Sequence, residues 1–576
     1  MRKLRNKSTE PASAKGSTRA AMPPDPTPLL LASGLTAQDV RGILSSYGVR
    51  AFEEADRNIQ SMAGEPHERR QLAAILPDLL QFTAGTADPD QALNHWERLF
   101  SAVVSRTSTL DYLRASPRML DLLCTIFGNS DALAFTLIRD PTLIHWLAEE
   151  DVLSSPPSRV GIERALRTSV ESLTVTELKL EALRRFRRRE MLKIGVRDLF
   201  RLATVEETTA SLSDLASVLI HAAYEIVDRD LRAEFGVPMH LSREGRWDET
   251  EFAVIGMGKL GGHELNYSSD VDLIYVYSSE GRTRRTAHQT ACKGSPGPEG
   301  ISNEEYFEVL ARRLTKALSE PTKEGYVFRV DLRLRAEGSV GQLARSLDEY
   351  GKYYRTRGRV WERLALLKAW PVAGSSAVGK TFVRMVKRFV WNQEDIGGDE
   401  RDALRIIRDV RAVKEMIDEK VADRGLERRN VKLGTGGIRE IEFLAQTVQV
   451  IAGGRVSGIV SRNTLATLKG LHQHRLLSQD ELRRLTDAYR FLRDVEHKLQ
   501  MVHEIQTHSL PDDEEQLTQC AIRMGYDAGN RRASLVRFRA DHARHTGHVN
   551  RAFRSFFYAP EQSALLRATL SAIRRA

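Results

Sequence analysis

Apolar residues recur at three- and four-residue spacing over two long stretches of the chain. In the first stretch, residues 36–235, the positions of Met119, Leu122 and Ile126 illustrate this period. The same period returns beyond Trp370 and continues almost to the last residue. Because one face of an α-helix repeats about every 3.6 residues, we predict that both stretches are helical.

Between these stretches the pattern changes to short runs of β-branched and aromatic residues. Phe252–Gly256 and Val271–Tyr277 predict two neighbouring strands joined by a glycine-rich link. Residues 325–335 alternate between apolar and polar positions over their second half and predict a third strand. A helix is expected between the second and third strands, with Ser302 and Glu305 as a candidate capping box at its start.

The predicted fold class is therefore α+β and predominantly helical, with a small mixed β-sheet between two helical regions. The predicted parts are a disordered basic tail (1–28), an N-terminal helical region (29–235), a sheet domain (236–375) and a C-terminal helical bundle (376–576). The glycine-containing polar stretch 278–301 is expected to be a mobile loop. At roughly 150 residues per domain, a chain of 576 residues has room for several packed parts.

Composition and charge restrict the class of protein. Hydrophobic residues make up 41% of the chain and charged residues 28%, so a stable core is expected. The net charge of +9 would permit nucleic-acid binding, but arginines are interspersed with acidic residues, as in 401–429, which is typical of solvated helix faces. The sequence contains no nucleic-acid-binding motif, so we expect no nucleic-acid partner. A mildly basic surface also suits nucleotide phosphates or an acidic protein.

Cysteine use and the N-terminal sequence indicate a cytoplasmic protein. Cys124, Cys292 and Cys520 lie far apart and include no pair with metal-ligand spacing, so neither a disulfide framework nor a zinc site is expected. The apolar run at 29–32 is too short for a signal sequence or a membrane span. No membrane partner is therefore expected.

The candidate chemistry lies in the glycine-rich link and the strands around it. Asp270 and Asp272 form an Asp-x-Asp pair at the start of the second predicted strand, and side chains two residues apart project from the same face. Asp331, on the third predicted strand, can converge on them. Carboxylates with little nitrogen or sulfur around them favour Mg²⁺. These three residues are the predicted metal ligands and catalytic residues.

The alternative is that Asp270 and Asp272 are solvent-facing carboxylates on an edge strand, as is usual for an isolated Asp-x-Asp. The surrounding sequence favours the metal site, because a glycine-rich turn precedes the pair and Asp-Leu-Arg-Leu-Arg follows at 331–335. A bound Mg²⁺ would neutralise charge on a transferred phosphoryl group and orient the attacking oxygen.

Glycines and polar residues near the carboxylates are predicted to bind the phosphates of a nucleotide. Glycines let backbone NH groups approach phosphate oxygens, and Lys, Ser and Arg side chains add donors. The predicted set is Gly258, Lys259, Gly261, Gly262, Ser269, Arg333, Arg335, Lys432 and Arg439. For Arg333 and Arg335 the alternative is surface salt bridging. For the turn at 434–443 the alternative is a helix N-terminus packed on the sheet.

Two features are expected to be structural rather than catalytic. His263 lies in the glycine-rich turn, where a lone histidine is more often a polar surface residue than a general base. Residues 489–499 are typical of an amphipathic helix in a bundle, with a packing role.

Four motifs follow one another along the chain. They are Gly258-Lys-Leu-Gly-Gly-His-Glu-Leu-Asn-Tyr-Ser-Ser-Asp-Val-Asp-Leu-Ile274, Val330-Asp-Leu-Arg-Leu-Arg335, Gly358-Arg-Val-Trp-Glu-Arg363 and Gly436-Gly-Ile-Arg-Glu-Ile-Glu-Phe443. Together they resemble the signatures of bacterial glutamine synthetase adenylyltransferases, which belong to the nucleotidyltransferase superfamily. The resemblance covers most of the chain, to about Pro511. Lys259 stands where the wider superfamily has Ser, Ala336 where Pro is common, and Trp370 where a basic residue is common.

This resemblance implies a function. Members of that family usually carry two nucleotidyltransferase domains, one attaching AMP to a tyrosine of glutamine synthetase and one removing it by phosphorolysis. The sequence contains one such motif set, and it is more similar to the N-terminal, AMP-removing copy. The resemblance implies that residues 236–375 form a nucleotidyltransferase domain that uses Mg²⁺, phosphate and ATP or ADP. The implied protein substrate is glutamine synthetase.

Two alternatives stay open at this point. The same site can attach AMP from ATP, or catalyse both directions. The chain can instead be a non-catalytic helical module that binds a nitrogen-signalling partner, such as a PII-type protein. The presence of all three carboxylates argues against the non-catalytic alternative.

Overall fold

The computed structural model describes residues 23–285, 300–392 and 399–576. The chain forms two compact units, Met1–Cys124 and Thr125–Ala576, and the division falls inside the predicted N-terminal helical region. Most of the predicted tail lies outside the described residues, as do the centre of the predicted mobile loop and Cys292.

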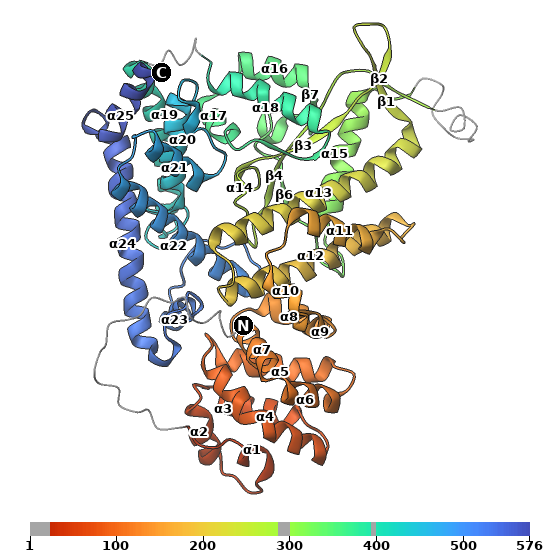
Figure 1. The fold of residues 1–576 in the computed structure, drawn as a ribbon, viewed down its shortest axis with the longest axis vertical. Helices are drawn as coiled ribbons and strands as arrows, with labels where there is room; N and C mark the ends of the chain where they lie inside the picture. The colour runs from red at the N-terminus through yellow and green to blue at the C-terminus, as the bar shows by residue number, and fades with distance from the viewer. Residues whose placement is uncertain (1–22, 286–299, 393–398) are drawn as a thin grey trace. The chain divides into compact units, whose positions relative to one another are not determined.

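The first unit is helical, as the apolar period predicts (Figure 1). Its two longest helices are Pro66–Ala84 (α4) and Pro89–Ala102 (α5), and Leu76, Trp96 and Leu99 in these helices are fully buried. The other helices are α1 (Pro28–Leu31), α2 (Ala37–Ser45), α3 (Phe52–Ser61) and α6 (Arg106–Ala115), and α7 (Pro117–Phe127) spans the division between the units.

Helices also dominate the second unit. Those before the sheets are α8 (Asp131–Arg139), α9 (Leu143–Ala148), α10 (Glu150–Ser154), α11 (Arg159–Val170), α12 (Thr176–Leu199) and α13 (Val205–Phe235). Those among and directly after the strands are α14 (Gly258–Gly261), α15 (Asn303–Ser319), α16 (Leu347–Thr356), α17 (Val360–Leu366) and α18 (Ser376–Val390). The C-terminal helices are α19 (Glu400–Ala422), α20 (Ile438–Ala452), α21 (Thr464–Gln473), α22 (Gln479–His503), α23 (Glu514–Arg523), α24 (Arg531–Phe557) and α25 (Ala564–Arg575).

Two small sheets interrupt these helices. The first contains β2 (Trp247–Glu249), β1 (Val237–Leu241) and β5 (Arg282–Arg284), in that order and all antiparallel. The second has the order β6 (Val330–Asp331), β4 (Val271–Tyr277), β3 (Phe252–Gly256) and β8 (Trp370–Gly374), with β7 (Ala344–Ser346) also paired to β4. Strand β4 is antiparallel to β3 and parallel to β6, so the predicted mixed sheet is confirmed.

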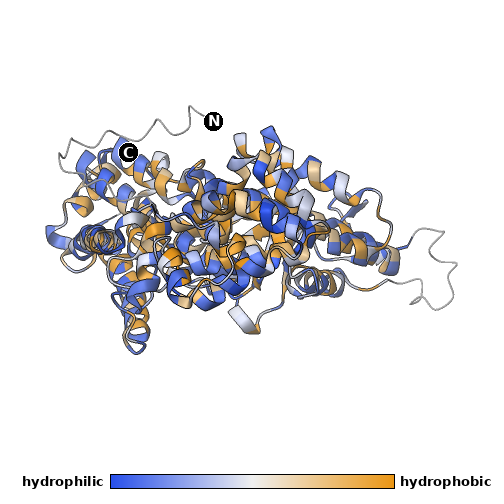
Figure 2. Ribbon diagram, turned by 90° about the horizontal axis from the view of Figure 1, so that it is seen from below, coloured by the Kyte–Doolittle hydropathy of each residue, from blue (hydrophilic) through white to orange (hydrophobic). Residues whose placement is uncertain are grey.

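Helices cover both faces of the second sheet. Phe252 and Val254 of β3 join an apolar cluster with α13 and α15, whereas Ala253 and Ile255 join a second cluster with α18 and α20. Side chains alternate along a strand, so a strand buried on both faces reads as a continuous apolar run. Most helices carry hydrophilic and hydrophobic residues on opposite sides (Figure 2), as expected of helices that cover a core.

Helix α13 is the one described helix that is long and apolar enough to cross a membrane by length and composition. Of its apolar window, 67% is buried inside the protein. Such burial is typical of the core helix of a globular unit, because a lipid-facing helix would leave that surface uncovered.

The predicted third strand is wrong in its extent, because only Val330–Asp331 pair with β4. The chain then turns: the backbone NH of Arg333 donates to Oδ1 of Asp331 at 2.8 Å, and the NH of Arg335 donates to the carbonyl of Leu332 at 3.3 Å. An Asp side chain that binds the backbone two residues on competes with a strand ladder. Arg333 and Arg335 therefore do not share a strand face with Asp331.

Candidate active site

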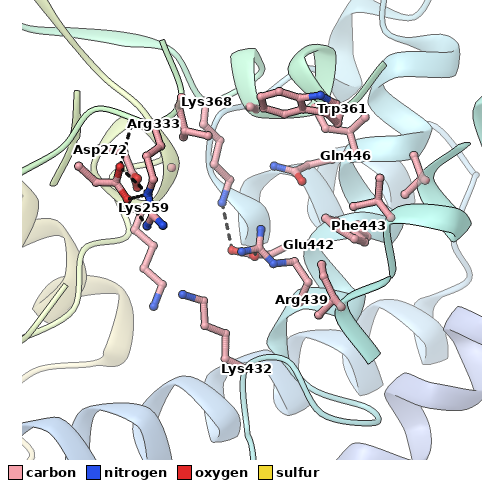
Figure 3. Close-up of a pocket in the computed structure, with 18 of the residues that line it drawn as sticks. Lys259, Asp272, Arg333, Trp361, Lys368, Lys432, Arg439, Glu442, Phe443 and Gln446 are labelled. Atoms are coloured by element: carbon pink, nitrogen blue, oxygen red, sulfur yellow. Dashed lines mark hydrogen bonds and ion pairs between the residues drawn. The ribbon is translucent and has the colours of Figure 1, made fainter. Parts of the chain in front are cut away.

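A pocket of about 770 Å³ lies where β4 and β6 face helices α17, α19 and α20. Its volume is in the range of small-molecule sites. Figure 3 shows Asp272 and Arg333 on one side of it and Trp361 and Phe443 on the other, with the amino group of Lys432 pointing into the space between. The pocket thus has an acidic end, a cationic middle and an apolar end.

The acidic end contains the three predicted carboxylates. Asp272 lies opposite Asp331 in the parallel pairing of β4 and β6, and register partners on neighbouring strands project to the same side of a sheet. Asp270 directly precedes β4, two positions before Asp272. All three residues line the pocket, so the structure brings together the side chains that the sequence predicted to converge.

Arginines engage two of the three carboxylates. Nε of Arg329 donates to Oδ1 of Asp270 at 2.7 Å, and Nε of Arg333 donates to Oδ2 of Asp331 at 2.9 Å. Among the residues that the structure describes, no group of three or more His, Cys, Asp or Glu side chains is placed to hold a metal ion. The carboxylates therefore share one pocket without forming a preassembled three-ligand cluster.

The electrostatics of the acidic end nevertheless suit a divalent cation. Burial and the neighbouring Asp331 raise the pKa of Asp272 to about 6. Burial opposes ionisation of Asp331 too, but hydrogen bonds from Arg333 outweigh it and lower the pKa of Asp331. A carboxylate that is partly desolvated beside like charges is stabilised by a cation. Mg²⁺ usually takes one or two carboxylates together with water and substrate phosphates, so this donor set fits it.

Three cations from distant parts of the chain line the middle of the pocket. Lys259 belongs to α14, Lys432 precedes α20, and Arg439 lies in the first turn of α20. Burial lowers the pKa of Lys432, and Arg439 adds to the shift. Burial also lowers the pKa of Lys259 to about 7, although Glu496 opposes the shift and Lys432 adds to it. Partly desolvated cations that repel one another are stabilised by the negative charge of phosphates.

A buried glutamate fixes the position of Lys259. Nζ of Lys259 donates to Oε1 of Glu496 at 2.9 Å, and the same oxygen lies 2.7 Å from Nδ1 of His508. Glu496 is fully buried on α22, in the segment whose pattern predicted packing alone. One signal was present in the sequence: Glu496 occupies the same helical face as Leu492 and Leu499, where an apolar residue is expected.

The predicted glycines divide into two groups. Gly258 has a φ of +51°, and a Cβ there would lie 2.3 Å from Oδ2 of Asp272, so any side chain would displace the carboxylate. Gly261 and Gly262 do not line the pocket. A Cβ on Gly261 would lie 2.0 Å from the carbonyl oxygen of Lys368. The structure thus places Gly261 at a close packing contact and not beside the pocket.

Arg335 also lies outside the pocket. Its buried guanidinium donates to the carbonyls of Leu332, Ser339 and Gly341 at 2.8, 3.1 and 2.8 Å. Arg335 therefore stabilises the loop that follows β6, and its guanidinium does not face the phosphate-binding part of the pocket. Of the predicted phosphate-binding set, the residues that do line the pocket are Gly258, Lys259, Ser269, Arg333, Lys432 and Arg439.

His263 takes no part in the pocket. Its Nε2 lies 2.9 Å from Oδ1 of Asp214 on α13, and its backbone φ is +60°. A partly exposed histidine held by a carboxylate away from the carboxylates of the pocket is consistent with the predicted structural role.

Helices form the apolar end of the pocket, which the sequence did not predict. The wall consists of Leu334, from the turn after β6, and of the helical residues Val360, Trp361, Leu364, Ala365, Val410, Val413, Ile417 and Phe443. Arg439, Phe443 and Gln446 follow one another at helical spacing on α20, so one helix face runs from the cationic middle to the apolar end over about 10 Å. The side-chain amide of Gln446 makes no hydrogen bond to any described residue.

A buried ion-pair network ties the first motif to these helices. Nζ of Lys368 donates to Oε2 of Glu264 at 2.8 Å and to Oε1 of Glu442 on α20 at 3.2 Å. Burial opposes ionisation of Glu442, but Lys368 and Arg439 outweigh it and lower the pKa of Glu442 to about 2. The network therefore fixes α20 against the glycine-rich loop.

Three carboxylates that face a set of partly buried cations across a nucleotide-sized pocket define a candidate nucleotidyl-transfer site. The family model described as glutamate-ammonia ligase adenylyltransferase matches residues 120–385, which contain all three carboxylates. Over that range the chain is similar to the glutamate-ammonia ligase adenylyltransferase family. A second family model, GlnD PII-uridylyltransferase, matches residues 411–557.

Curated relatives are each named bifunctional glutamine synthetase adenylyltransferase/adenylyl-removing enzyme. The chain is 36% identical to the protein of Nitrosococcus oceani over 444 residues, which are 77% of this chain and 43% of the relative. It is 34% identical to that of Thioalkalivibrio sulfidiphilus over 496 residues (85% and 46%) and 39% identical to that of Aromatoleum aromaticum over 407 residues (70% and 40%). The chain thus spans less than half the length of these relatives.

Proposed function

We propose that this chain transfers an adenylyl group at a tyrosine of glutamine synthetase, with phosphorolytic removal as the favoured direction. The observation that carries the proposal is the two-ended pocket, in which carboxylates and cations adjoin an apolar wall. The names of the relatives support glutamine synthetase as the substrate. The residues of the first motif, which resemble the AMP-removing copy of the family, support the direction of transfer.

In the favoured reaction an oxygen of inorganic phosphate attacks the phosphorus of the AMP-tyrosine. The bond from that phosphorus to the tyrosine oxygen breaks, the tyrosine oxygen takes up a proton, and ADP leaves. Lys259, Lys432 and Arg439 hold phosphate oxygens in line for the displacement, since positioning and charge stabilisation are the main contributions a protein makes to it.

Mg²⁺ is the proposed cofactor, and Asp270, Asp272 and Asp331 would hold it. When bound, the ion neutralises charge on the phosphates. Because Arg329 and Arg333 engage the two outer carboxylates, we expect Asp272 to be the principal ligand. Gly258 keeps open the space that the Asp272 carboxylate occupies.

The apolar end is the proposed binding site for the adenine base. Trp361 and Phe443 offer aromatic surface, and Gln446 offers an amide that can both donate to and accept from a base edge. The span of about 10 Å along α20 from Arg439 to Gln446 is comparable to the length of a nucleotide from phosphate to base.

Incubation of the purified chain with Mg²⁺, inorganic phosphate and adenylylated glutamine synthetase tests the proposal. We expect release of ADP, measured by chromatography, and none from the Asp272→Ala variant. A parallel incubation with unmodified synthetase and labelled ATP tests the other direction, and label on the synthetase without ADP release in the first assay would reverse the assignment. Inactivity in both assays would favour a helical binding module.

We further propose a PII-type signalling protein as a regulatory partner and the cytoplasm as the location. The match of residues 411–557 to the GlnD PII-uridylyltransferase family model supports such a partner. Co-elution of the purified chain with a PII-type protein in size-exclusion chromatography tests it, and separate elution across effector conditions would contradict it.

A further inference from the structure

A second pocket, of about 220 Å³, lies between helices α8 and α12 and the segment that precedes β6. Four arginines line this arginine pocket: Arg139, Arg184, Arg187 and Arg188. None of them lines the candidate active site, so the proposed reaction does not account for their concentration in one small cavity.

Two of these arginines are buried and incompletely bonded. Arg184 and Arg187 are 4% and 8% exposed, and within the described residues Nε of each has no hydrogen-bond partner. The guanidinium of Arg187 lies over the rings of Tyr326 and Phe328, 5.2 Å from each centroid. Burying a guanidinium costs free energy unless acceptors or opposite charges compensate it.

The acidic residues of the arginine pocket do not balance its charge. Glu324 accepts a hydrogen bond from Arg188 at 2.8 Å and lies 3.0 Å from Arg139, and Glu504 pairs with Arg187. Two carboxylates thus line the pocket together with four guanidinium groups, and a third, Glu181, lies outside the lining at 3.5 Å from Arg184. Burial opposes ionisation of Glu324, but Arg188 and Arg139 outweigh it and lower the pKa of Glu324, as expected where positive charge prevails.

We propose that the arginine pocket binds a small, doubly charged oxyanion, recognised through phosphate or carboxylate oxygens. The planar fork of a guanidinium matches the spacing of two such oxygens, and each hydrogen bond is assisted by charge. A cavity of about 220 Å³ admits inorganic phosphate or a short dicarboxylate but is too small for a nucleotide.

The arginine pocket adjoins the loop that carries Asp270. Tyr267 and Tyr326 line it, and the hydroxyl of Tyr326 accepts a hydrogen bond from Arg329 at 2.9 Å. Arg329 in turn donates to Asp270 at 2.7 Å. An oxyanion in the arginine pocket is therefore two side chains away from the acidic end of the active site, while occupying a different cavity.

Two substitutions that break the same ion pair from opposite ends test the proposal. Arg188→Gln removes a donor and positive charge, so we expect binding of the oxyanion to weaken at least tenfold, roughly the value of one charge-assisted hydrogen bond. Glu324→Gln removes a competing carboxylate and frees Arg139 and Arg188, so we expect binding to tighten several-fold. Calorimetric titration of the full chain with inorganic phosphate, and separately with succinate, measures both.

The exposed pair Arg313–Glu234, at 2.8 Å and outside both pockets, supplies the matched control. Arg313→Gln and Glu234→Gln make the same charge changes and should leave binding unchanged. Binding of phosphate, succinate or both that Arg188→Gln weakens supports the proposal and identifies the oxyanion. Phosphate binding that Arg188→Gln leaves unchanged belongs to the active-site pocket and, without succinate binding, would contradict the proposal. Absence of binding of both probes to the wild type and to Glu324→Gln would overturn it. A loss of oxyanion affinity in both Arg188→Gln and Glu324→Gln would also overturn the proposal. An ion pair with a purely structural role would give the same loss from either side.

Discussion

The two ends of the active-site pocket are built by different means. The acidic end comes from adjacent strands of one sheet, where Asp272 and Asp331 are register partners and Asp270 is two residues away. The cationic middle and the apolar end come from helices that are far apart in the sequence, α14, α17, α19 and α20. A sheet places chemistry through local periodicity, whereas a helical wall places it through packing.

Because the two ends are built differently, substitutions in them should affect activity and stability to different degrees. The acidic end can be disturbed by changing one carboxylate without affecting the surrounding core, since Asp270 and Asp331 are held by their own arginines. The cationic middle and the apolar end, together called the helical end, depend on buried ion pairs such as Lys259–Glu496, so breaking such a pair changes stability as well as chemistry. Substitution of a carboxylate at the acidic end should therefore reduce activity alone, whereas a substitution that breaks a buried ion pair at the helical end should also reduce stability.

The largest effect is expected at the acidic end. Asp272→Asn should reduce adenylyl transfer by roughly a thousandfold or more, because it removes the carboxylate best placed to hold a divalent ion. The metal-free protein should not lose stability, since the half-buried Asp272 carboxylate lies beside Asp331 and their repulsion disappears. Activity assays and thermal unfolding without metal measure the two effects.

Asp248→Asn on β2 is the matched control, because Asp248 is exposed and lies outside the pocket. It should change neither activity nor unfolding. Wild-type turnover by Asp272→Asn would contradict the assignment of the acidic end.

The next effect is on stability at the helical end. Glu496→Gln leaves Lys259 buried without its partner, and breaking a buried ion pair from one side costs roughly 3 kcal/mol or more of unfolding free energy. The control is Glu206→Gln, which breaks the exposed pair with Arg490 on the same helix α22 and should cost about 1 kcal/mol or less. Urea denaturation measures both, and equal costs would show that burial of the pair is unimportant.

The sequence predicted most of the sheet end and little of the helical end. β3, β4 and the convergence of Asp270, Asp272 and Asp331 on one pocket follow from short-range alternation, which needs no knowledge of distant segments. The third strand was predicted too long, because the Asp331 side chain binds the backbone of Arg333 and ends the ladder. Arg335 was misplaced for the same reason.

The helical wall could not be predicted because its residues carry no local signal of their chemistry. Trp361 and Phe443 lie inside two of the quoted motifs, but their spacing is that of any core helix, and only the tertiary packing turns them toward one pocket. Lys432 and Arg439 were found through the motif around them. Glu496 was missed as a positioning residue, since a single acidic residue on an apolar helix face has many explanations until its partner is known.

A smaller effect is expected on nucleotide specificity, which should depend on the apolar end of the pocket and not on the acidic end. Among the described residues, Gln446 supplies the one side-chain amide at the apolar end, so we expect Gln446→Leu to lower affinity for ADP roughly tenfold while affinity for GDP changes little. Gln506→Leu makes the same substitution at the acidic end, where Gln506 lies 3.4 Å from Asp270, and should affect both nucleotides alike. Fluorescence competition titrations measure the ratio. An unchanged ratio of ADP to GDP affinity in Gln446→Leu would show that Gln446 does not recognise the base.

The smallest effect is the pH dependence of anion binding at Lys259, in the cationic middle of the pocket. Burial lowers the pKa of Lys259 to about 7, despite the opposing effect of Glu496, so its ammonium form predominates at pH 6 and its neutral form at pH 8. Anion affinity at this residue is therefore highest below pH 7, and we expect metal-free ADP binding to weaken about fivefold between pH 6 and pH 8.

The Lys259→Met variant is the control and should bind ADP weakly at both pH values. Because the phosphates of ADP titrate identically with both proteins, the difference between their pH profiles isolates the lysine. Parallel profiles would mean that Lys259 keeps its proton across this range, held by Glu496 more strongly than burial opposes it.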